Sequence, residues 1–489
     1  MNNMKQNDNR VFHISLIISI LIVLWGIIGQ SSFANFANSL LGFLTNNFGW
    51  AYLISMLIFV VFAIILAFSK YGNLKLGPDD SEPEYSNASW FAMLFGAGMG
   101  IGLVFWGVAE PLSHFVAPPG MEAGSVEAAD FAMKSSFMHW GFHPWANYSI
   151  IGLALAYFQF RKDKPGLISS IFIPLFGEER VNGPIGKLID ILAVFATVAG
   201  VATSLGLGTL QINSGLNYLF NIPETALIQI LIILIITVIT IWTAVRGIDK
   251  GIKILGDINL YIASGLLILV IILGPTLAII NNFTNGLGLY ISDFIKDSLS
   301  ISAFGDNSWV NNWRIFYWAW WIAWAPFVGS FIARISKGRT IKEFVGGVIL
   351  APALVSIVWF AAFGSLGLNL TDVVGLDTLS QAAQFPETAL FKVFEYYPLT
   401  NILSLITVIL LTTFFITSSN SATFVLGMFT SNGDLNPTNS KKFLWGVVQA
   451  LLATALLLSG GLEALQTASV AAAFPFIFVM LLAMVSLMK

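Results

Sequence analysis

Long apolar runs, separated by short polar connectors, are the feature that most restricts how this chain can fold. About 12 such runs occur, and each has at least about 19 residues, which is enough for a helix to cross roughly 30 Å of hydrocarbon. The approximate spans are 12–30, 49–69, 88–117, 131–160, 186–219, 224–245, 254–282, 310–336, 344–368, 399–429, 441–460 and 464–488. Several are longer than a simple crossing needs, so we expect strong tilts or breaks. The sequence therefore predicts an all-α integral membrane protein with about 12 transmembrane helices.

The composition supports this prediction and excludes several classes of protein. Of the 489 residues, 56% are hydrophobic and only 10% are charged, whereas soluble proteins have about 25% charged residues. A net charge of -3 indicates no nucleic-acid partner. Because the chain has no cysteine, it has no disulfide or thiolate chemistry. The first apolar run lacks a small-residue cleavage site, so we expect a retained helix rather than a signal peptide.

The basic residues indicate how the predicted helices are oriented. With a cytoplasmic N-terminus and this helix count, all but four of the 23 Lys and Arg fall on the cytoplasmic side. The exceptions are Lys134, Lys296, Arg314 and Lys392. A miscount by one helix would remove this asymmetry. We therefore expect a multi-pass protein of the cell (plasma) membrane. Two amphipathic stretches, 287–300 and 379–397, are predicted to lie along the membrane surface.

A glycine-rich stretch lies in the middle of the third apolar run. The sequence "GAGMGIGLVFWGVAEP" places alternating glycines at 96, 98, 100 and 102, and each costs a helix about 1 kcal/mol relative to alanine. Close helix packing through small residues is one explanation. Alternating glycines do not share one helical face, however, and this favours a local unwinding. The N-terminus of a half-helix there would offer free N–H groups and a positive dipole end to an anion.

Tryptophans are concentrated in the eighth apolar run, "FYWAWWIAWAPFVGSFIARISKGR". They are Trp318, Trp320, Trp321 and Trp324. A belt of aromatic residues at the membrane interface explains tryptophans near the ends of spans, such as Trp90 and Trp313. It does not explain Trp321, which lies about thirteen residues before the basic end of its span and therefore near mid-membrane.

A second aromatic group, "HWGFHPWANY", contributes Trp140, Trp145 and Tyr148 in the fourth run. The face of a tryptophan attracts a cation by about 0.5–2 kcal/mol, and aromatic cages are the usual receptors for quaternary ammonium groups. The core of the eighth run contains no Asp or Glu. A cage combined with a glycine-rich anion cradle fits a zwitterion with a methylated ammonium at one end and a carboxylate at the other.

Three motifs resemble the betaine–carnitine–choline transporter family: "GMGIGLVFWGVAEPL", "HWGFHPW" and "WAWWIAWAPFVGSFIARISKGRTIKEF". The resemblance extends over essentially the whole chain, through "TSSNSATFVLGM" and the final run. It implies a five-plus-five inverted repeat (spans 3–7 and 8–12), a homotrimer and an alternating-access mechanism. The implied divisions are two extra N-terminal helices in 1–87, a first repeat in 88–282, an amphipathic surface helix in 283–306 and a second repeat in 307–489.

The resemblance also implies a substrate site. The positions matching the ammonium-binding aromatics are Trp140, Trp145, Tyr148 and Trp321. Trp320 and Trp324 match tryptophans on the substrate route, whereas we expect Trp318 to serve packing. The unwound stretch that would receive the carboxylate corresponds to Gly98, Met99, Gly100 and Gly102.

Sodium ions are the implied coupling ions, and no other cofactor is expected. The family's first sodium site maps onto carbonyls and hydroxyls of Gly96, Met99, Phe414, Thr417 and Ser418. A second site maps onto Thr197 and the region of Phe327. The sequence departs from the family there, because Val201 stands where another threonine is expected; Thr203 or Ser204 could compensate, or the site is altered.

Three further features of the sequence bear on coupling and regulation. Asn420 stands where aspartate is common in the family, with an unknown effect. Sodium-independent exchangers replace sodium with a basic side chain in span 5, and residues 188–220 contain no Lys or Arg. Members that sense osmotic stress often carry a long charged C-terminal tail, so we expect any regulation here to reside elsewhere.

The remaining polar candidates are predicted to be structural. We expect Glu110 to have a structural partner and Asp190 to cap or pair at the interface. The four histidines lack metal-ligand spacing, and no nucleotide or catalytic motif occurs, so the chain is not expected to be an enzyme. A channel would need a polar pore lining, and a lipid-modifying enzyme would need convergent carboxylates or metal ligands.

The sequence favours a sodium-coupled symporter of glycine betaine or a similar compatible solute for osmoprotection. The alternative is a sodium-independent exchanger, or a symporter of another trimethylammonium compound such as carnitine or choline.

Overall fold

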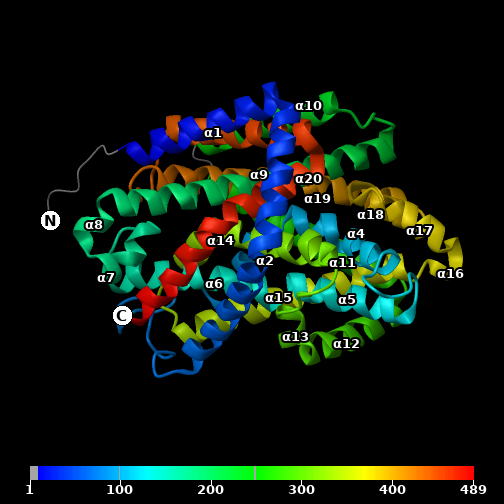
Figure 1. Cartoon of the computed structure of the whole chain (residues 1–489), viewed down its shortest axis with the longest axis horizontal. Coiled ribbons are helices and arrows are strands. Elements are labelled where there is room, and N and C mark those ends of the chain that lie inside the picture. Colours follow the sequence, from blue (N-terminus) through cyan, green and yellow to red (C-terminus); the bar gives the residue numbers. More distant parts are fainter. Residues whose placement is uncertain (1–8, 99, 247–248) are drawn as a thin grey trace.

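The computed structural model describes residues 9–98, 100–246 and 249–489, and this part of the chain forms helices joined by turns. It contains no β-strand within those ranges, only an isolated bridge between Lys75 and Thr340. Most helices run along the long axis of the molecule, and α2 crosses them obliquely (Figure 1). The all-α prediction is confirmed for the described residues.

The helices of the first half are α1 (Arg10–Ile28), α2 (Gln30–Phe68), α3 (Asn87–Gly98), α4 (Ile101–Val116), α5 (Val126–Trp140), α6 (Phe142–Ala156), η1 (Tyr157–Arg161), η2 (Ser169–Phe172), α7 (Ile173–Phe176), α8 (Glu178–Val181), α9 (Pro184–Phe220), α10 (Ala226–Arg246) and α11 (Asp249–Leu273). Those of the second half are α12 (Thr276–Ser292), α13 (Phe294–Ser298), η3 (Val310–Ile315), α14 (Phe316–Ile335), α15 (Ile341–Leu368), α16 (Thr371–Val374), α17 (Leu376–Ala383), α18 (Pro386–Phe394), α19 (Thr400–Phe429) and α20 (Asn439–Met488).

Local sequence signals fix several helix ends. Thr340 and Glu343 form a reciprocal capping box at the start of α15, with side-chain to backbone distances of 3.2 and 2.9 Å. Ser125 caps α5 by accepting a hydrogen bond from the Ala128 N–H at 3.1 Å. Helix α9 begins with Pro184 and ends at Phe220, and the next residue, Asn221, closes it in a left-handed conformation (φ 55°).

Several helices are long and apolar enough to cross a membrane. In the part of the chain that the structure describes, nine helices meet this description, and the bent pair Asn87–Gly96 and Ile101–Val116 is a tenth candidate. The expected fourth span is instead two 15-residue helices, α5 and α6, which meet at Gly141. The last two expected spans form α20, which bends where Gly461 has φ 56° and ψ −132°. The helices identify an all-α membrane protein.

Two expected boundaries are wrong. Helix α2 begins at Gln30 rather than at 49, because residues 31–48 contain no proline and only one glycine to interrupt a helix. The expected 254–282 span ends at Leu273, since Pro275 cannot continue the hydrogen-bond ladder. Both predicted surface stretches are helical, and each is divided between two helices: the first between α12 and α13, the second between α17 and α18 at Pro386.

The helices differ strongly in burial, and this difference identifies the interior of the bundle. Of the 18 most apolar consecutive residues in each helix, 94% are buried in Val310–Ile335 and 83% in Pro184–Phe220. Only 17% are buried in Ile254–Leu273. The outer helices instead expose large side chains such as Trp242 and Tyr261, as expected for surfaces that face lipid. Helices α14 and α9 therefore form the centre, where α14 packs against α6, α9 and α20.

Polar contacts hold the outer elements to this centre. Lys134 of α5 donates to Asp293 at 2.7 Å and lies 3.1 Å from Asp297, which joins α5 to α12 and α13. The hydrogen bond from Lys134 lowers the pKa of Asp293. Trp90 is buried, donates to Ser336 Oγ at 3.0 Å and is covered by the Arg339 guanidinium at 3.9 Å. The basic segment after α14 therefore covers Trp90 and separates its ring from the surface.

Candidate functional site

The glycine-rich stretch separates two helices near the centre of the molecule. Helix α3 ends at Gly98 and α4 begins at Ile101, and the axes before and after the stretch differ by 67°. Gly100 immediately precedes α4 in an extended conformation, whereas Met99 lies outside the described residues. The helices on the two sides of the glycine stretch are separate elements, as predicted. The N-terminus of α4 therefore has N–H groups without intrahelical partners.

Gly102 brings this helix break against the aromatic residues. A Cβ atom added at Gly102 would lie 2.5 Å from Cη2 of Trp320 and 3.0 Å from Cη2 of Trp140. Real Cβ atoms do not approach other heavy atoms within 3.0 Å, so a side chain here would require the indole rings to move. Glycine is needed at this position for close approach rather than for an unusual φ angle. The start of α4 and the aromatic group thus meet at one place.

The predicted aromatic residues form a continuous cluster in which successive rings are nearly perpendicular. The Trp140 and Trp321 rings are 4.8 Å apart at 75°, Trp321 and Tyr148 are 6.4 Å apart at 84°, and Tyr148 and Trp145 are 5.6 Å apart at 85°. Trp320 instead stacks on Trp321 at 4.8 Å and 14°. All five side chains are buried. Perpendicular neighbours present their faces in different directions, as the walls of a cation cage do.

The other tryptophans of α14 occupy different surroundings. Trp324 lies 5.5 Å from Phe327 and packs against Gly200 of α9, where an added Cβ would lie 2.6 Å from its ring. Trp318 stacks on His143 at 4.7 Å, in agreement with a packing role. Among the described residues, the buried Nε1 atoms of Trp320 and Trp324 have no hydrogen-bond partner. The same is true of Trp318 Nε1, so a missing partner does not by itself distinguish a ligand-binding tryptophan from a packing one.

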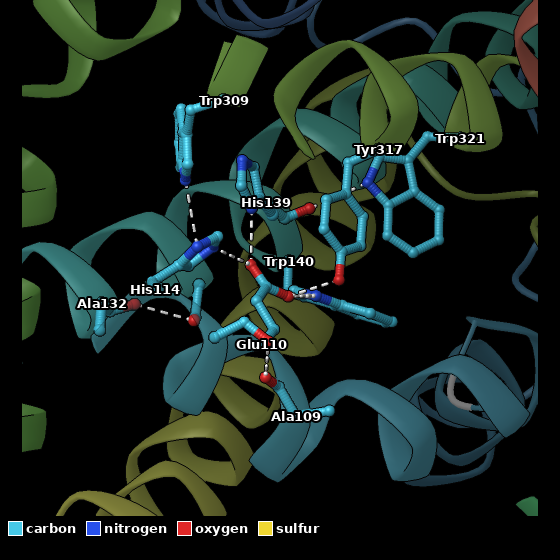
Figure 2. Close-up of polar contacts among 11 residues, drawn as sticks. Ala109, Glu110, His114, Ala132, His139, Trp140, Trp309, Tyr317 and Trp321 are labelled. Atoms are coloured by element: carbon cyan, nitrogen blue, oxygen red, sulfur yellow. Dashed lines mark hydrogen bonds and ion pairs between the residues drawn. The ribbon is translucent and has the colours of Figure 1, made fainter. Parts of the chain in front are cut away.

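The carboxylate of Glu110 lies between His114 and His139 on one side and the rings of Trp140 and Tyr317 on the other (Figure 2). Its Oε2 accepts hydrogen bonds from Trp140 Nε1 at 2.8 Å and from the Tyr317 hydroxyl at 2.5 Å. Its Oε1 lies 2.6 Å from Nδ1 of His139, whose carbonyl accepts from Trp321 Nε1 at 2.9 Å. The prediction of a structural partner for Glu110 is confirmed. One acidic residue of α4 therefore joins α5 and α14.

The same network brings three potential metal ligands together. Single ligand atoms of Glu110, His114 and His139 all lie within 4.8 Å of one another. The 2.6 Å distance between Glu110 and His139 is shorter than the ~3.3 Å expected between two ligands bound tetrahedrally to zinc at about 2.0 Å. The geometry is that of a hydrogen-bond network. Glu110 and His114 are one helical turn apart in α4, but His139 comes from α5, so no local sequence pattern joins the three residues.

The first predicted sodium site is assembled only in part. Ser418 lies beside the helix break, with its Oγ 3.9 Å from the position of a Cβ at Gly100. Thr417 bonds to backbone carbonyls instead, at 3.0 Å to Thr413 and 3.1 Å to Phe414, and it accepts from Asn259 Nδ2 at 3.1 Å.

The remaining ligands of that site are not brought together by these contacts. Gly96 is exposed near the end of α3 with no neighbour within 4 Å of an added Cβ, and Met99 lies outside the described residues. The Ser418 hydroxyl is therefore the part of the predicted set that faces the break.

The second predicted site lies between α9 and α14. Thr197 is buried and donates to its own backbone at Ala193 O, at 2.8 Å, and Phe327 is buried on the facing helix. Thr203 is bonded to Leu465 O and Ser469 Oγ, both at 2.8 Å, so its hydroxyl is committed to α20.

Two other polar residues have clear structural contacts. Asn420 donates to Thr243 Oγ1 at 2.8 Å and thereby joins α19 to α10. Asp190 caps the segment at Ser169, accepting from its N–H at 2.9 Å and its hydroxyl at 2.8 Å, as predicted.

Sequence reasoning missed two members of the aromatic cluster. Tyr317 lies one helical turn before Trp321, and their rings are 5.9 Å apart, so helical spacing alone could have identified it. Phe360 of α15 lies 5.1 Å from Trp140. No pattern in the sequence distinguishes Phe360 from the other phenylalanines of that apolar helix.

Comparisons with known proteins agree with this geometry. A family model described as "BCCT, betaine/carnitine/choline family transporter" matches residues 10–489. The chain is 48% identical to the glycine betaine transporter OpuD of Bacillus subtilis, over 99% of this chain and 94% of that protein. It is 44% identical to the ectoine/hydroxyectoine transporter of Virgibacillus pantothenticus (99% and 96% covered). It is 40% identical to the osmo-dependent choline transporter BetT2 of Acinetobacter baylyi (99% and 71% covered). The chain therefore belongs to the betaine/carnitine/choline transporter family, whose members are membrane transporters rather than enzymes.

Proposed function

We propose that this protein is a secondary active transporter that carries glycine betaine, or a similar compatible solute, into the cell together with sodium ions. The contact of Gly102 with Trp140 and Trp320 is the observation that carries this proposal. It brings the N-terminal end of a half-helix against a cluster of aromatic faces. A zwitterion with a carboxylate and a quaternary ammonium group matches these two surfaces. Uptake of such a solute would serve osmoprotection.

Each end of the substrate has a physical partner in this arrangement. The first N–H groups of α4 and the positive end of its dipole suit the carboxylate. The perpendicular rings of Trp140, Trp321 and Tyr148 suit the ammonium group, which has no N–H to donate and gains from cation–π attraction. The free indole N–H groups of Trp320 and Trp324 provide polar contacts for a substrate in transit. The glycine betaine transporter at 48% identity supports this choice of substrate.

Sodium coupling is proposed from the surroundings of the break. The Ser418 hydroxyl lies beside Gly100, and carbonyl groups at a helix break are suitable sodium ligands. Residues 188–220 contain no basic side chain that could take the place of the ion. The alternative is a sodium-independent exchanger, or a transporter of carnitine or choline. The relative named as a choline transporter, at 40% identity, keeps that substrate class open.

The proposed architecture has 12 spans in an inverted repeat, with spans 3–7 and 8–12 as its halves, in a homotrimer at the cell membrane. The division of α20 at Gly461 supports two spans in that helix. The ends of the bundle differ, with α7 and α8 at one end and α16 to α18 at the other (Figure 1). We assign the end with α7 and α8 to the cytoplasm together with the N-terminus, because most basic residues fall on that side of the predicted topology.

Uptake into proteoliposomes tests the proposal. The purified protein should accumulate labelled glycine betaine above its external concentration when an inward sodium gradient is imposed. Potassium in place of sodium should abolish accumulation. Unlabelled choline, carnitine and ectoine, added as competitors, would rank the substrates. Betaine exchange that does not depend on sodium would support the alternative, and a failure to transport any of these solutes would contradict the proposal.

A further inference from the structure

The Glu110 carboxylate is a buried acidic group that touches the cage rings without lying among them. Its residue is fully buried, and three donors surround it: Trp140 Nε1, the Tyr317 hydroxyl and His139 Nδ1 (Figure 2). His114 Nε2 lies 3.4 Å from Oε1. A buried carboxylate is tolerated only when it is hydrogen-bonded or paired. Donors from three side chains can stabilise a negative charge on Glu110 beside the aromatic cluster.

Hydrogen bonds to a carboxylate change how the aromatic rings act on a cation. The Trp140 N–H and the Tyr317 O–H are in-plane groups of two rings of the cluster, whose centroids are 5.6 Å apart and whose planes meet at 69°. A negative charge bonded to such a group pushes electron density into the ring, and the face becomes more negative. Cation–π attraction is electrostatic and depends on that potential. Since charges interact over several ångströms in a medium of low dielectric constant, the carboxylate also attracts the cation directly.

We infer that Glu110 is a positioning and charge-tuning residue that sets the preference of the site for a cationic head group. The inference depends on the proposed function, in which Trp140 and Trp321 bind the ammonium group. Glu110 does not touch the substrate; it acts through Trp140 and Tyr317 and through the attraction of its charge for the cation. A purely structural role, in which Glu110 only joins α4, α5 and α14, would affect all ligands of the same shape equally. The charge of the ligand's head group therefore separates the two roles.

The variant Glu110→Gln removes the charge and allows the network to persist. The glutamine carbonyl can accept from Trp140 and Tyr317, while its NH₂ group donates to Nδ1 of His139. His139 can then carry its proton on Nε2, which has no other partner among the described residues. Glu110→Asp keeps the charge on a side chain one methylene shorter. Asp190→Asn is the matched control, because it neutralises another buried carboxylate whose two hydrogen bonds come from Ser169.

The experiment compares two ligands of one shape. Glycine betaine and 3,3-dimethylbutanoate differ only in that a carbon atom replaces the positively charged nitrogen. Their inhibition constants are measured on the purified full-length protein by competition against labelled betaine. Wild type should bind betaine at least tenfold more tightly than the analogue, whose head group carries no charge. Glu110→Gln should lose about tenfold in affinity for betaine and less than twofold for the analogue, whereas Glu110→Asp and Asp190→Asn should keep the wild-type ratio.

Three results would overturn the inference. One is a wild-type protein whose inhibition constant for the analogue is less than threefold that for betaine. This result does not depend on whether any variant folds. Another is an equal loss of both ligands in Glu110→Gln, which would assign the residue a structural role only. The third is a betaine affinity that Glu110→Gln leaves unchanged. A wild-type protein that fails to bind betaine at all would instead contradict the proposed function, so the two failures can be distinguished.

Discussion

The broken pair α3–α4 and the tryptophan-rich α14 contribute to the same site in opposite ways. The first is interrupted at its glycines and changes direction by 67°, whereas α14 continues for 20 residues despite Pro326. An interrupted helix has free backbone groups at its new end, but a continuous helix uses its backbone groups internally and can offer only side chains. One element therefore suits an anion and the other a cation. The contrast explains how a site between them can select a zwitterion without a charged residue in contact with it.

Substitution at the break should give the largest effect. We predict that Gly102→Asp weakens betaine binding at least thirtyfold, about 2 kcal/mol. The new Cβ would lie 2.5 Å from the Trp320 ring, and the new carboxylate would repel that of betaine. The same charge should admit choline, which has the ammonium head but a neutral hydroxyl. Competition uptake at equal expression measures both changes.

Gly102→Asn separates the size of the new side chain from its charge. It should also weaken betaine binding, because it meets the same indole ring, but it should gain no choline uptake. If wild type carries choline as well as betaine, or if the aspartate variant gains none, the carboxylate does not bind at the break.

Substitution in α14 should give the next largest effect. We predict that Trp321→Leu raises the Kd for betaine at least about tenfold, because it removes a buried aromatic face worth up to about 2 kcal/mol to a cation. Calorimetry on the purified variant measures the change, and size-exclusion chromatography checks that it folds. Trp318→Phe is the control, since the Trp318 ring stacks on His143, and it should keep the wild-type affinity. An unchanged Kd in Trp321→Leu would contradict the cage.

The smallest effect is expected at the hydroxyl group beside the break. Ser418→Ala should raise the sodium concentration for half-maximal betaine uptake about threefold to tenfold, with a smaller shift for Thr417→Ala because Thr417 bonds to backbone carbonyls. Thr412→Ala is the control, since its hydroxyl also bonds to its own helix, at Val408 O. If betaine uptake depends on the sodium concentration in the same way in wild type and in both the Ser418 and the Thr417 variants, these hydroxyl groups have a structural role only.

The sequence predicted best those helices whose apolar runs end at strong stop signals. The observed Pro184–Phe220 and Thr400–Phe429 agree with the expected 186–219 and 399–429 to within about two residues. The start of α2 could not be predicted, because a mixed stretch without proline can be helical or not depending on its tertiary contacts. The division between α5 and α6 at Gly141 could not be predicted either, because one glycine in an apolar run does not by itself end a helix.

The site shows the same limit in its side chains. The aromatic residues were recognisable because they are close together within two segments, and the rings of Trp140 and Trp321 are indeed in contact. The partners of Glu110 were not recognisable, since Tyr317 is 207 residues away along the chain. Hydrogen bonds between distant helices depend on how the helices pack, and local sequence patterns do not encode that packing.

An experimental structure with glycine betaine bound is the most direct test of the central claim, which is that the break and α14 bind opposite ends of one substrate. We predict the ammonium nitrogen within about 6 Å of the ring centroids of Trp140 and Trp321. The carboxylate should accept hydrogen bonds of about 2.7–3.2 Å from the backbone N–H groups at residues 100–102. Betaine bound in the reverse orientation, or with its carboxylate away from the start of α4, would contradict the account.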